Sequence, residues 1–208
     1  LLERQEQLMR LARDIANREV DPRQFEIRAE SLVAQYGELM ALSWIDDRRR
    51  VVAIQASPSV KAARDWMEDG ILKPGEVEAG YGLARDLLQP VYSQPVGVGK
   101  AEPILQLHLP ITPRGKFAGE LVAEYSVDAL LRYGVPAEIL AKYAVALLDS
   151  KGQTLAGQSI PDRPGLSEFL PWSGKVNEFE IPVSPVGNGL VLRAQAWRTS
   201  QGLVGGAL

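Results

Sequence analysis

The sequence of 208 residues contains no cysteine and a single histidine, His108. Without cysteine the chain cannot form disulfides, zinc–thiolate sites, iron–sulfur clusters or thiol nucleophiles. With one histidine it cannot build a multi-histidine metal site, and a catalytic triad would have to use that same residue. We therefore expect neither a metal nor a cofactor.

Sequence patterns of catalysis are also missing. No G-x-S-x-G precedes a predicted helix, and the glycines at 97–99 and 202–206 lack the strand–glycine–helix context of a phosphate loop. Two pairs of carboxylates stand at a predicted turn and on one strand face, which are commonplace positions: Asp46/Asp47 and Glu120/Glu124. We predict that this chain is not itself an enzyme, and a hydrolase that depends on His108 is the distant alternative.

Neither sign of charge is in large excess, because 23 Lys and Arg face 26 Asp and Glu, for a formal net charge of −3. A nucleic-acid binder would normally carry a basic face. The one basic run, residues 48–50, directly follows two aspartates and fits a solvated turn. Nucleic acid is therefore not an expected partner.

Long hydrophobic runs are absent, since no stretch approaches the ~20 apolar residues that span a bilayer. The sequence starts at Leu1 inside a predicted helix and ends in an apolar run, 202–208, after Trp197-Arg198. An aromatic and a cation before an apolar run are typical of a membrane interface. We expect a piece of a longer membrane protein, in which residues 199–208 lead toward a transmembrane helix.

What the sequence does contain is typical of a folded protein, with 46% hydrophobic and 24% charged residues. Its length allows one large domain or two small ones. Apolar periodicity and turn residues predict helices over 1–19, 23–37, near 60–68, 76–88, 127–133 and 136–142. Alternating or apolar runs predict strands over 40–45, 51–56, 104–111, 117–126, 179–183 and 190–197, and a strand–turn–strand unit over 144–156. The first helix has two apolar aspects, and we expect it to run along both sheets.

The segments 41–53 and 144–156 repeat one layout: an apolar strand, an Asp at its end (Asp46 or Asp149), a basic turn, and an apolar strand that ends in Ala. Each is followed later by a longer hairpin, which suggests a duplicated module. The predicted fold class is α+β, with two tandem modules that are each an antiparallel sheet flanked by helices. The expected divisions are a helical region 1–38, a membrane-distal module 39–135, a membrane-proximal module 136–198 and a tail 199–208.

Five segments, taken in order, resemble a known family: Trp44-Ile-Asp-Asp, Pro90-Val-Tyr-Ser, Leu105-Gln-Leu-His-Leu-Pro-Ile, Gly115-Lys-Phe-Ala-Gly-Glu-Leu-Val-Ala-Glu-Tyr-Ser and Tyr143-Ala-Val-Ala-Leu-Leu-Asp. The family is that of the periplasmic double-PDC (tandem PAS-like, double Cache) sensor domains of bacterial sensor histidine kinases, and the C4-dicarboxylate sensor group is the most similar. The resemblance covers about residues 1–198. It implies a domain outside the cytoplasmic membrane that is flanked by two transmembrane helices. The aromatic–Arg–Trp-Tyr signature of some amino-acid receptors is absent.

Candidate ligand-binding residues come from the predicted strand 104–111, where Gln106 and His108 point away from Leu105, Leu107 and Leu109. Polar side chains on a covered face need partners, and a small polar ligand could be one. The alternative is that they bond to covering loops or to water.

The insertion 58–102 is the expected cover for that face, and it supplies Trp66, Tyr81, Arg85 and Tyr92. Arg85 could grip a carboxylate, and tyrosine hydroxyls could add directional donors. The alternatives are a solvated arginine beside Asp86 and tyrosines of the core. Trp44 could wall the pocket or belong to the core.

These observations predict an extracytoplasmic ligand-sensing domain of a transmembrane receptor, a histidine kinase first, that binds a small organic anion such as a carboxylate in the first module. The second module would relay the change. Three alternatives stay open: the input domain of a chemoreceptor, that of a diguanylate cyclase, and a domain without a small ligand that senses a protein partner or dimerises. A homodimer is compatible with the apolar stripe of the first helix.

Overall fold

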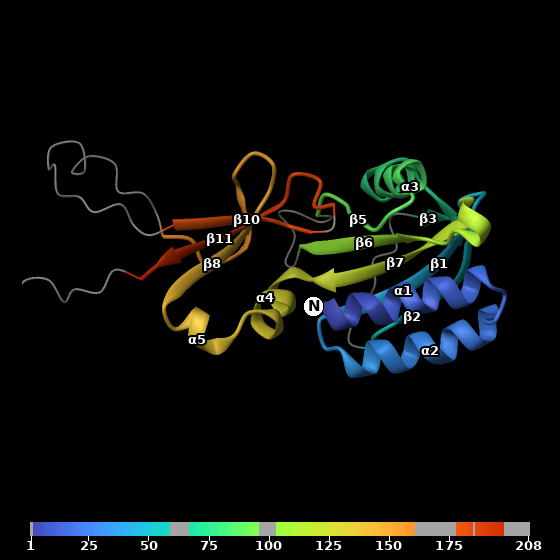
Figure 1. Ribbon diagram of the computed structural model, residues 1–208, viewed down its shortest axis with the longest axis horizontal. Helices are drawn as coiled ribbons and strands as arrows, with labels where there is room; N and C mark the ends of the chain where they lie inside the picture. The colour runs from blue at the N-terminus through green and yellow to red at the C-terminus, as the bar shows by residue number, and fades with distance from the viewer. Residues whose placement is uncertain (1, 59–66, 96–102, 161–177, 185, 198–208) are drawn as a thin grey trace, which may run out of the picture.

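A computed structural model describes residues 2–58, 67–95, 103–160, 178–184 and 186–197. Within these ranges the chain forms two antiparallel sheets with helices packed on them, so the predicted α+β class is confirmed. Figure 1 shows the two sheets side by side along the long axis of the molecule.

Two helices precede the first sheet, α1 (Leu2–Ala16) and α2 (Pro22–Gln35). The Asp21-Pro22 pair separates them for a local reason. The Asp21 side chain accepts a hydrogen bond from the Gln24 backbone N–H at 2.8 Å, and the Gln24 side chain accepts one from the Asp21 backbone N–H at 3.0 Å. This reciprocal capping box starts α2, and Pro22 fits the first helical turn because it has no N–H to leave unpaired.

The first sheet has the strand order β2-β1-β7-β6-β5. Its strands are β1 (Leu39–Asp46), β2 (Val51–Ala56), β5 (Val91–Tyr92), β6 (Ile104–Pro110) and β7 (Gly119–Ser126). The two-residue strands β3 (Met67–Glu68) and β4 (Ile71–Leu72) pair with each other. Helix α3 (Glu76–Leu87) follows them. The helix predicted near 60–68 is therefore wrong at Met67–Glu68, and residues 59–66 lie outside the described part.

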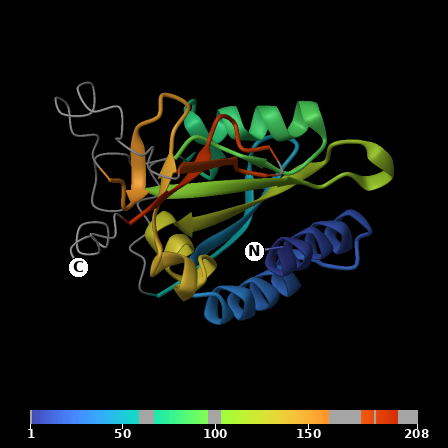
Figure 2. The ribbon, with the colours of Figure 1, turned by 60° about the vertical axis from the view of Figure 1, so that its left-hand side comes forward.

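The first sheet is covered on both faces. Figure 2 shows α1 and α2 on one side of the strands and α3 on the other. The side toward α1 and α2 holds the main hydrophobic core, to which Leu8, Phe25, Leu107 and Leu121 belong. The side toward α3 holds a smaller apolar cluster around Val122. Because both faces of the sheet are covered, most side chains of β6 and β7 are buried, including polar ones.

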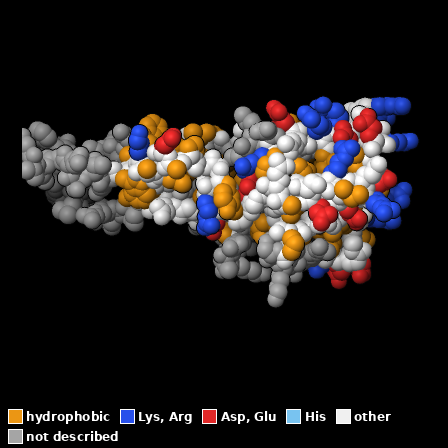
Figure 3. All heavy atoms as spheres, turned by 90° about the horizontal axis from the view of Figure 1, so that it is seen from below, with side chains coloured by type: hydrophobic (Ala, Val, Ile, Leu, Met, Phe, Trp, Pro, Cys, Tyr) orange, Lys and Arg blue, Asp and Glu red, His pale blue; other side chains and the backbone are white. Residues whose placement is uncertain are grey.

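The second sheet has the order β10-β11-β8-β9. Its strands are β8 (Tyr143–Leu148), β9 (Thr154–Gly157), β10 (Glu178–Pro182) and β11 (Val191–Ala196). Helices α4 (Val127–Gly134) and α5 (Ala137–Leu140) connect the two sheets, with the 3₁₀ turn η1 (Pro113–Gly115) earlier in the β6–β7 loop. Figure 3 shows charged side chains gathered over the first sheet's end of the molecule, and hydrophobic ones over the second sheet.

The two modules share one turn in atomic detail. Asp46 accepts hydrogen bonds from the backbone N–H groups of Arg48 and Arg50, each at 2.8 Å. Asp149 accepts the equivalent two from residues 151 and 153, also at 2.8 Å. The third turn position has a left-handed backbone in both, at Arg49 (φ 65°) and at Gly152 (φ 76°). The repeat read from the sequence therefore corresponds to a repeated structure.

One expectation about the first helix is wrong. Helix α1 packs against β6 and β7 of the first sheet, and it does not run along both sheets. The turn at Asp21-Pro22 sends the chain back as α2 beside α1, and Arg28 of α2 pairs with Asp14 of α1 at 2.6 Å. The apolar residues Leu8, Leu11 and Ile15 of α1 belong to the core of the first sheet.

Candidate functional site

The face of the first sheet under α3 is unusually polar for a buried surface. Gln106 and His108 from β6 point to it, as predicted from their alternation with the leucines. Glu120 and Glu124 of β7 and Ser43 of β1 lie on the same face, because they pair across the sheet with its members or alternate with them. All five side chains are at most 5% exposed. We call these five residues the polar face.

Two hydrogen-bonded pairs organise the polar face. The His108 imidazole Nδ1 lies 2.9 Å from Glu120 Oε1, and both side chains have no exposed surface. The Gln106 amide Nε2 donates to Glu124 Oε1 at 2.8 Å. Burial raises the pKa of the Glu120 carboxyl, and the neighbouring His108 opposes this shift through its charge and its hydrogen bond. The pair is therefore held in a dry environment, where electrostatic interactions are strong.

Four buried polar atoms of this face have no hydrogen-bond partner among the described residues: Ser43 Oγ, Gln106 Oε1, His108 Nε2 and Glu120 Oε2. An unpaired buried polar atom costs about 1–3 kcal/mol. Native proteins rarely leave such atoms together without a partner. All four atoms can accept a hydrogen bond when the His108 proton is on Nδ1. A bound ligand or ordered water that offers hydrogen-bond donors would therefore satisfy them.

Helix α3 approaches this face closely because of Gly80. A Cβ atom added there would come to 2.3 Å from His108 Nε2 and 2.7 Å from two ring carbons. Any residue other than glycine would therefore force the helix away from the imidazole. The position of Gly80 fixes α3 directly over the unpaired nitrogen of His108.

Tyr81 and Arg85 of α3 face different environments, although they are four residues apart. Tyr81 is buried, its hydroxyl donates to the Asp46 carbonyl at 3.0 Å, and its ring meets Phe117 edge-on at 5.3 Å. Burial, with a smaller contribution from the Glu120 charge, raises the pKa of Tyr81 to about 12. Arg85 is exposed and pairs with Asp86 at 2.9 Å, which raises the pKa of its guanidinium. Arg85 lies in the last turn of α3, with its side chain about half exposed.

Two other candidates lie on the opposite side of the sheet. Tyr92 pairs in register with Leu107, and Trp44 pairs with Leu121, so both point into the core under α1 and α2. Trp44 packs edge-on against Phe25, with ring centroids 6.0 Å apart. The sequence predicts Tyr92 in the cover of the His108 face, and its pairing with Leu107 places it on the other face instead. Trp66 lies outside the described residues.

The sequence places Glu120 and Glu124 on one strand face, but we interpreted this pair as commonplace and did not include it in the candidate site; Ser43 and Gly80 were missed. The signal for the two glutamates was present, because residues 119–126 alternate and Glu120 and Glu124 share a face opposite Leu121 and Tyr125. Gly80 had no sequence signal, since its role depends on a ring that lies on a distant strand.

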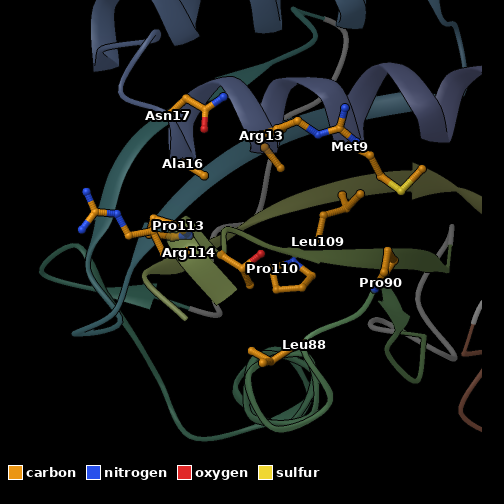
Figure 4. Close-up of a pocket in the computed structure, with 12 residues that line it drawn as sticks. Met9, Arg13, Ala16, Asn17, Leu88, Pro90, Leu109, Pro110, Pro113 and Arg114 are labelled. Carbon is orange, nitrogen blue, oxygen red and sulfur yellow. The ribbon is translucent and has the colours of Figure 1, made fainter. Parts of the chain in front are cut away.

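A separate surface cavity of about 230 Å³ lies where the end of α1, the end of α3 and the β6–β7 loop meet (Figure 4). Arg13, Asn17 and Arg114 line it together with prolines and leucines. Figure 4 shows the Arg13 and Arg114 guanidinium groups pointing to different sides, so they do not converge on one anion. This cavity contains none of the polar-face residues.

Among the described residues, no group of three or more His, Cys, Asp or Glu side chains is placed to hold a metal ion. In the same part of the chain, no helix has the length and the apolar composition to cross a membrane.

No family model matches the sequence, and no curated protein matches it. Solved structures do match the fold. The ligand-binding domain of the amino acid chemoreceptor PctC of Pseudomonas aeruginosa PAO1, in complex with GABA, is 16% identical with a TM-score of 0.56, over 93% of this chain and 89% of that one. The ligand-binding domain of the Pseudomonas fluorescens chemoreceptor CtaA, with L-leucine, is 17% identical with a TM-score of 0.56, over 91% and 83%.

The extracellular domain of rpHK1S-Z16, a protein assigned as a histidine kinase, is 15% identical with a TM-score of 0.54, over 93% of this chain and 86% of that one. This chain therefore has the fold of extracellular sensor domains that occur in chemoreceptors and in proteins assigned as histidine kinases. The two-module architecture expected from the family resemblance is confirmed at the level of fold. The particular relation to C4-dicarboxylate sensors stays a prediction.

Proposed function

We propose that this chain is the extracytoplasmic ligand-sensing domain of a transmembrane receptor, and that the receptor is a sensor histidine kinase. The observation that carries the proposal is the polar face, where four buried polar atoms lack partners among the described residues beneath α3. The fold shared with receptor domains that were crystallised with small ligands supports it.

The ligand that fits the polar face donates hydrogen bonds at its buried end. Glu120 Oε2 and Gln106 Oε1 are acceptors, and His108 Nε2 is an acceptor whenever the proton is on Nδ1. A bare anion would meet the carboxylates of Glu120 and Glu124 there, which is unfavourable in a dry site. The expected carboxylate group of the ligand therefore belongs at the solvent side of α3. There Arg85 could release Asp86 and pair with the ligand carboxylate.

Signalling requires that the ligand bind two positions of α3 with different affinity. Tyr81 connects α3 to the end of β1 through its hydrogen bond to Asp46, and Glu78 of the same helix pairs with Arg49 in that turn. A shift of α3 would therefore reach the β1–β2 turn directly.

A chemoreceptor is the second candidate, because chemoreceptor domains share the fold at equal similarity. The two kinds of receptor differ in the effector domain that the full-length protein carries on the other side of the membrane. The full-length sequence decides between them, and the absence of a transmembrane helix on both sides of this domain would overturn the proposal.

The test is a thermal-shift screen of the chain against amino acids, small amines and organic acids. A ligand at 100 times its dissociation constant adds about 2.7 kcal/mol of stability. We expect a hit whose shift is lost in His108→Ala and reduced in Arg85→Ala. The matched control is Arg28→Ala, which removes an exposed, ion-paired arginine on α2 and should keep the full shift. A hit that survives His108→Ala places the ligand elsewhere.

A further inference from the structure

A second cavity, of about 330 Å³, lies between the two sheets. Tyr92 and Leu105 line it from the first module, and Leu147 and Leu192 line it from the second. Helix α4, which Figure 1 shows at the junction of the two sheets, contributes Leu130 and its neighbours. The cavity thus has walls from both modules, and one of its lining residues, Ile181, is 62% exposed.

The chemistry of the walls restricts what can bind. Among the described residues that line the cavity there is no charged side chain, and the polar groups are those of Gln5, Tyr92 and Ser184. An ion placed there would lose its hydration without gaining a partner of opposite charge. Burial raises the pKa of Tyr92 to about 12, so its hydroxyl is neutral. The occupant must therefore be uncharged and mostly apolar.

The size of the cavity is sufficient for a ligand. An engineered apolar cavity of ~150 Å³ stays dry and binds benzene, and natural ligand pockets start at ~300 Å³. The walls offer water few polar partners, whereas a well-held buried water molecule makes two to four hydrogen bonds.

We propose that the cavity between the modules binds a small uncharged apolar molecule, about the size of a one- or two-ring aromatic compound. This site is separate from the polar face, because Tyr92 and Leu105 lie on the opposite side of the first sheet from His108.

Occupancy would matter because the cavity adjoins the link between the modules. The Tyr92 backbone N–H donates to the Val186 carbonyl at 2.7 Å, and Val91 forms a parallel bridge with Val186. The Gln94 side chain donates to the Asn188 carbonyl close by. Val91 is also paired in register with His108. A molecule in the cavity therefore contacts β5, the edge strand of the first sheet. The same strand binds Val186 of the second module.

The experiment uses toluene as the probe and the chain with ¹³C-labelled Leu and Val methyl groups. We expect saturable methyl shifts and intermolecular NOEs from toluene to Leu130, Leu147 and Leu192. Val183→Trp, which fills the cavity from its second-module wall, should weaken toluene binding at least tenfold. Leu87→Trp, on the exposed side of α3, is the matched control and should leave it unchanged.

The proposal is overturned if toluene shows no saturable binding up to its solubility, or if its NOEs fall on methyl groups outside the cavity. An unchanged affinity in Val183→Trp overturns it as well. If Val183→Trp does not fold, Leu192→Phe is used in its place. The NOE measurement on the unmodified chain tests the proposal without any variant. His108→Ala removes the ligand response of the polar face but should not change toluene binding, so the two proposals fail independently.

Discussion

Burying His108 against Glu120 removes two ionisable groups from water and leaves each with an unpaired atom. Such a pair is weak support for stability, because desolvation offsets most of the attraction between the partners. The pair instead provides oriented hydrogen-bond acceptors for a ligand. A site that already holds dry, oriented acceptors discriminates strongly in favour of ligands that satisfy them, since other ligands leave them unpaired.

Glu120→Gln tests the electrostatic state of this pair. Burial raises the Glu120 pKa in the folded chain above its value in the unfolded chain, so its stabilising contribution is complete below the unfolded value and is lost as pH rises through the folded value. Glutamine does not titrate. The melting temperature of Glu120→Gln minus that of the unmodified chain should therefore increase as pH rises from about 4.5.

The control for that series is Glu30→Gln, an exposed carboxylate on α2. If the difference curves of the two variants run parallel from pH 4 to 8, folding does not raise the pKa of the Glu120 carboxyl, which contradicts the burial described for this pair.

Helix α3 is the element that the site depends on, and two of its glycines separate packing from helix propensity. An alanine at Gly80 would place its Cβ against the His108 ring, whereas an added Cβ at Gly82 meets nothing within 4 Å. We expect Gly82→Ala to stabilise the chain by about 1 kcal/mol through helix propensity. Gly80→Ala should destabilise it by about 1–3 kcal/mol through overpacking.

Urea unfolding of both variants measures these changes. Gly80→Ala should lower the free energy of unfolding by less in the His108→Ala background than in the unmodified chain. The reason is that the ring that the new methyl group meets is absent from that background. Equal stabilisation by the two glycine substitutions would mean that α3 does not lie on His108.

The repeated β-turn gives a second prediction at the scale of elements. Asp46→Ala and Asp149→Ala each remove a side chain that accepts two backbone N–H groups at 2.8 Å. We expect each to lower the free energy of unfolding by about 1–2 kcal/mol, by analogy with a lost helix cap. The loss at Asp46 should be the larger, since Arg49 and Tyr81 also tie its turn to α3. Chemical denaturation of the two variants would contradict this if Asp149→Ala were the costlier.

At the scale of the whole molecule, part of the architecture could be predicted from the sequence. The two Asp-ended hairpins carry their own turn chemistry, so local sequence sufficed to identify the duplication and the α+β class. Gln106 and His108 could be placed on one face because strand alternation is a local property. The glutamates of β7 carried the same signal.

Tertiary contacts decided the rest. The face that Tyr92 takes depends on its pairing with Leu107, fifteen residues later in the chain, and a two-residue strand has no periodicity of its own. The position of α1 depends on α2 folding back along it. Gly80 became important only when α3 met a ring from β6. In each case the partner is distant in sequence, and neither spacing nor propensity specifies it.

The link between the modules gives a prediction at this scale. Tyr92 and Gln94 of the first module are bound to Val186 and Asn188 of the second, so a ligand on the polar face should be sensed across the junction. We expect amide chemical shifts of residues 186–196 to change on ligand binding, although no ligand contact occurs there. Shifts confined to the first module would mean that the second does not relay the signal.

The most direct measurement is a crystal structure of this chain with the strongest ligand from the thermal-shift screen. We expect the ligand between α3 and the polar face, with a donor within hydrogen-bond distance of Glu120 Oε2 or His108 Nε2 and its carboxylate toward Arg85. A ligand bound in the Arg13–Arg114 cavity or in the second module, with the polar face unchanged, would contradict it.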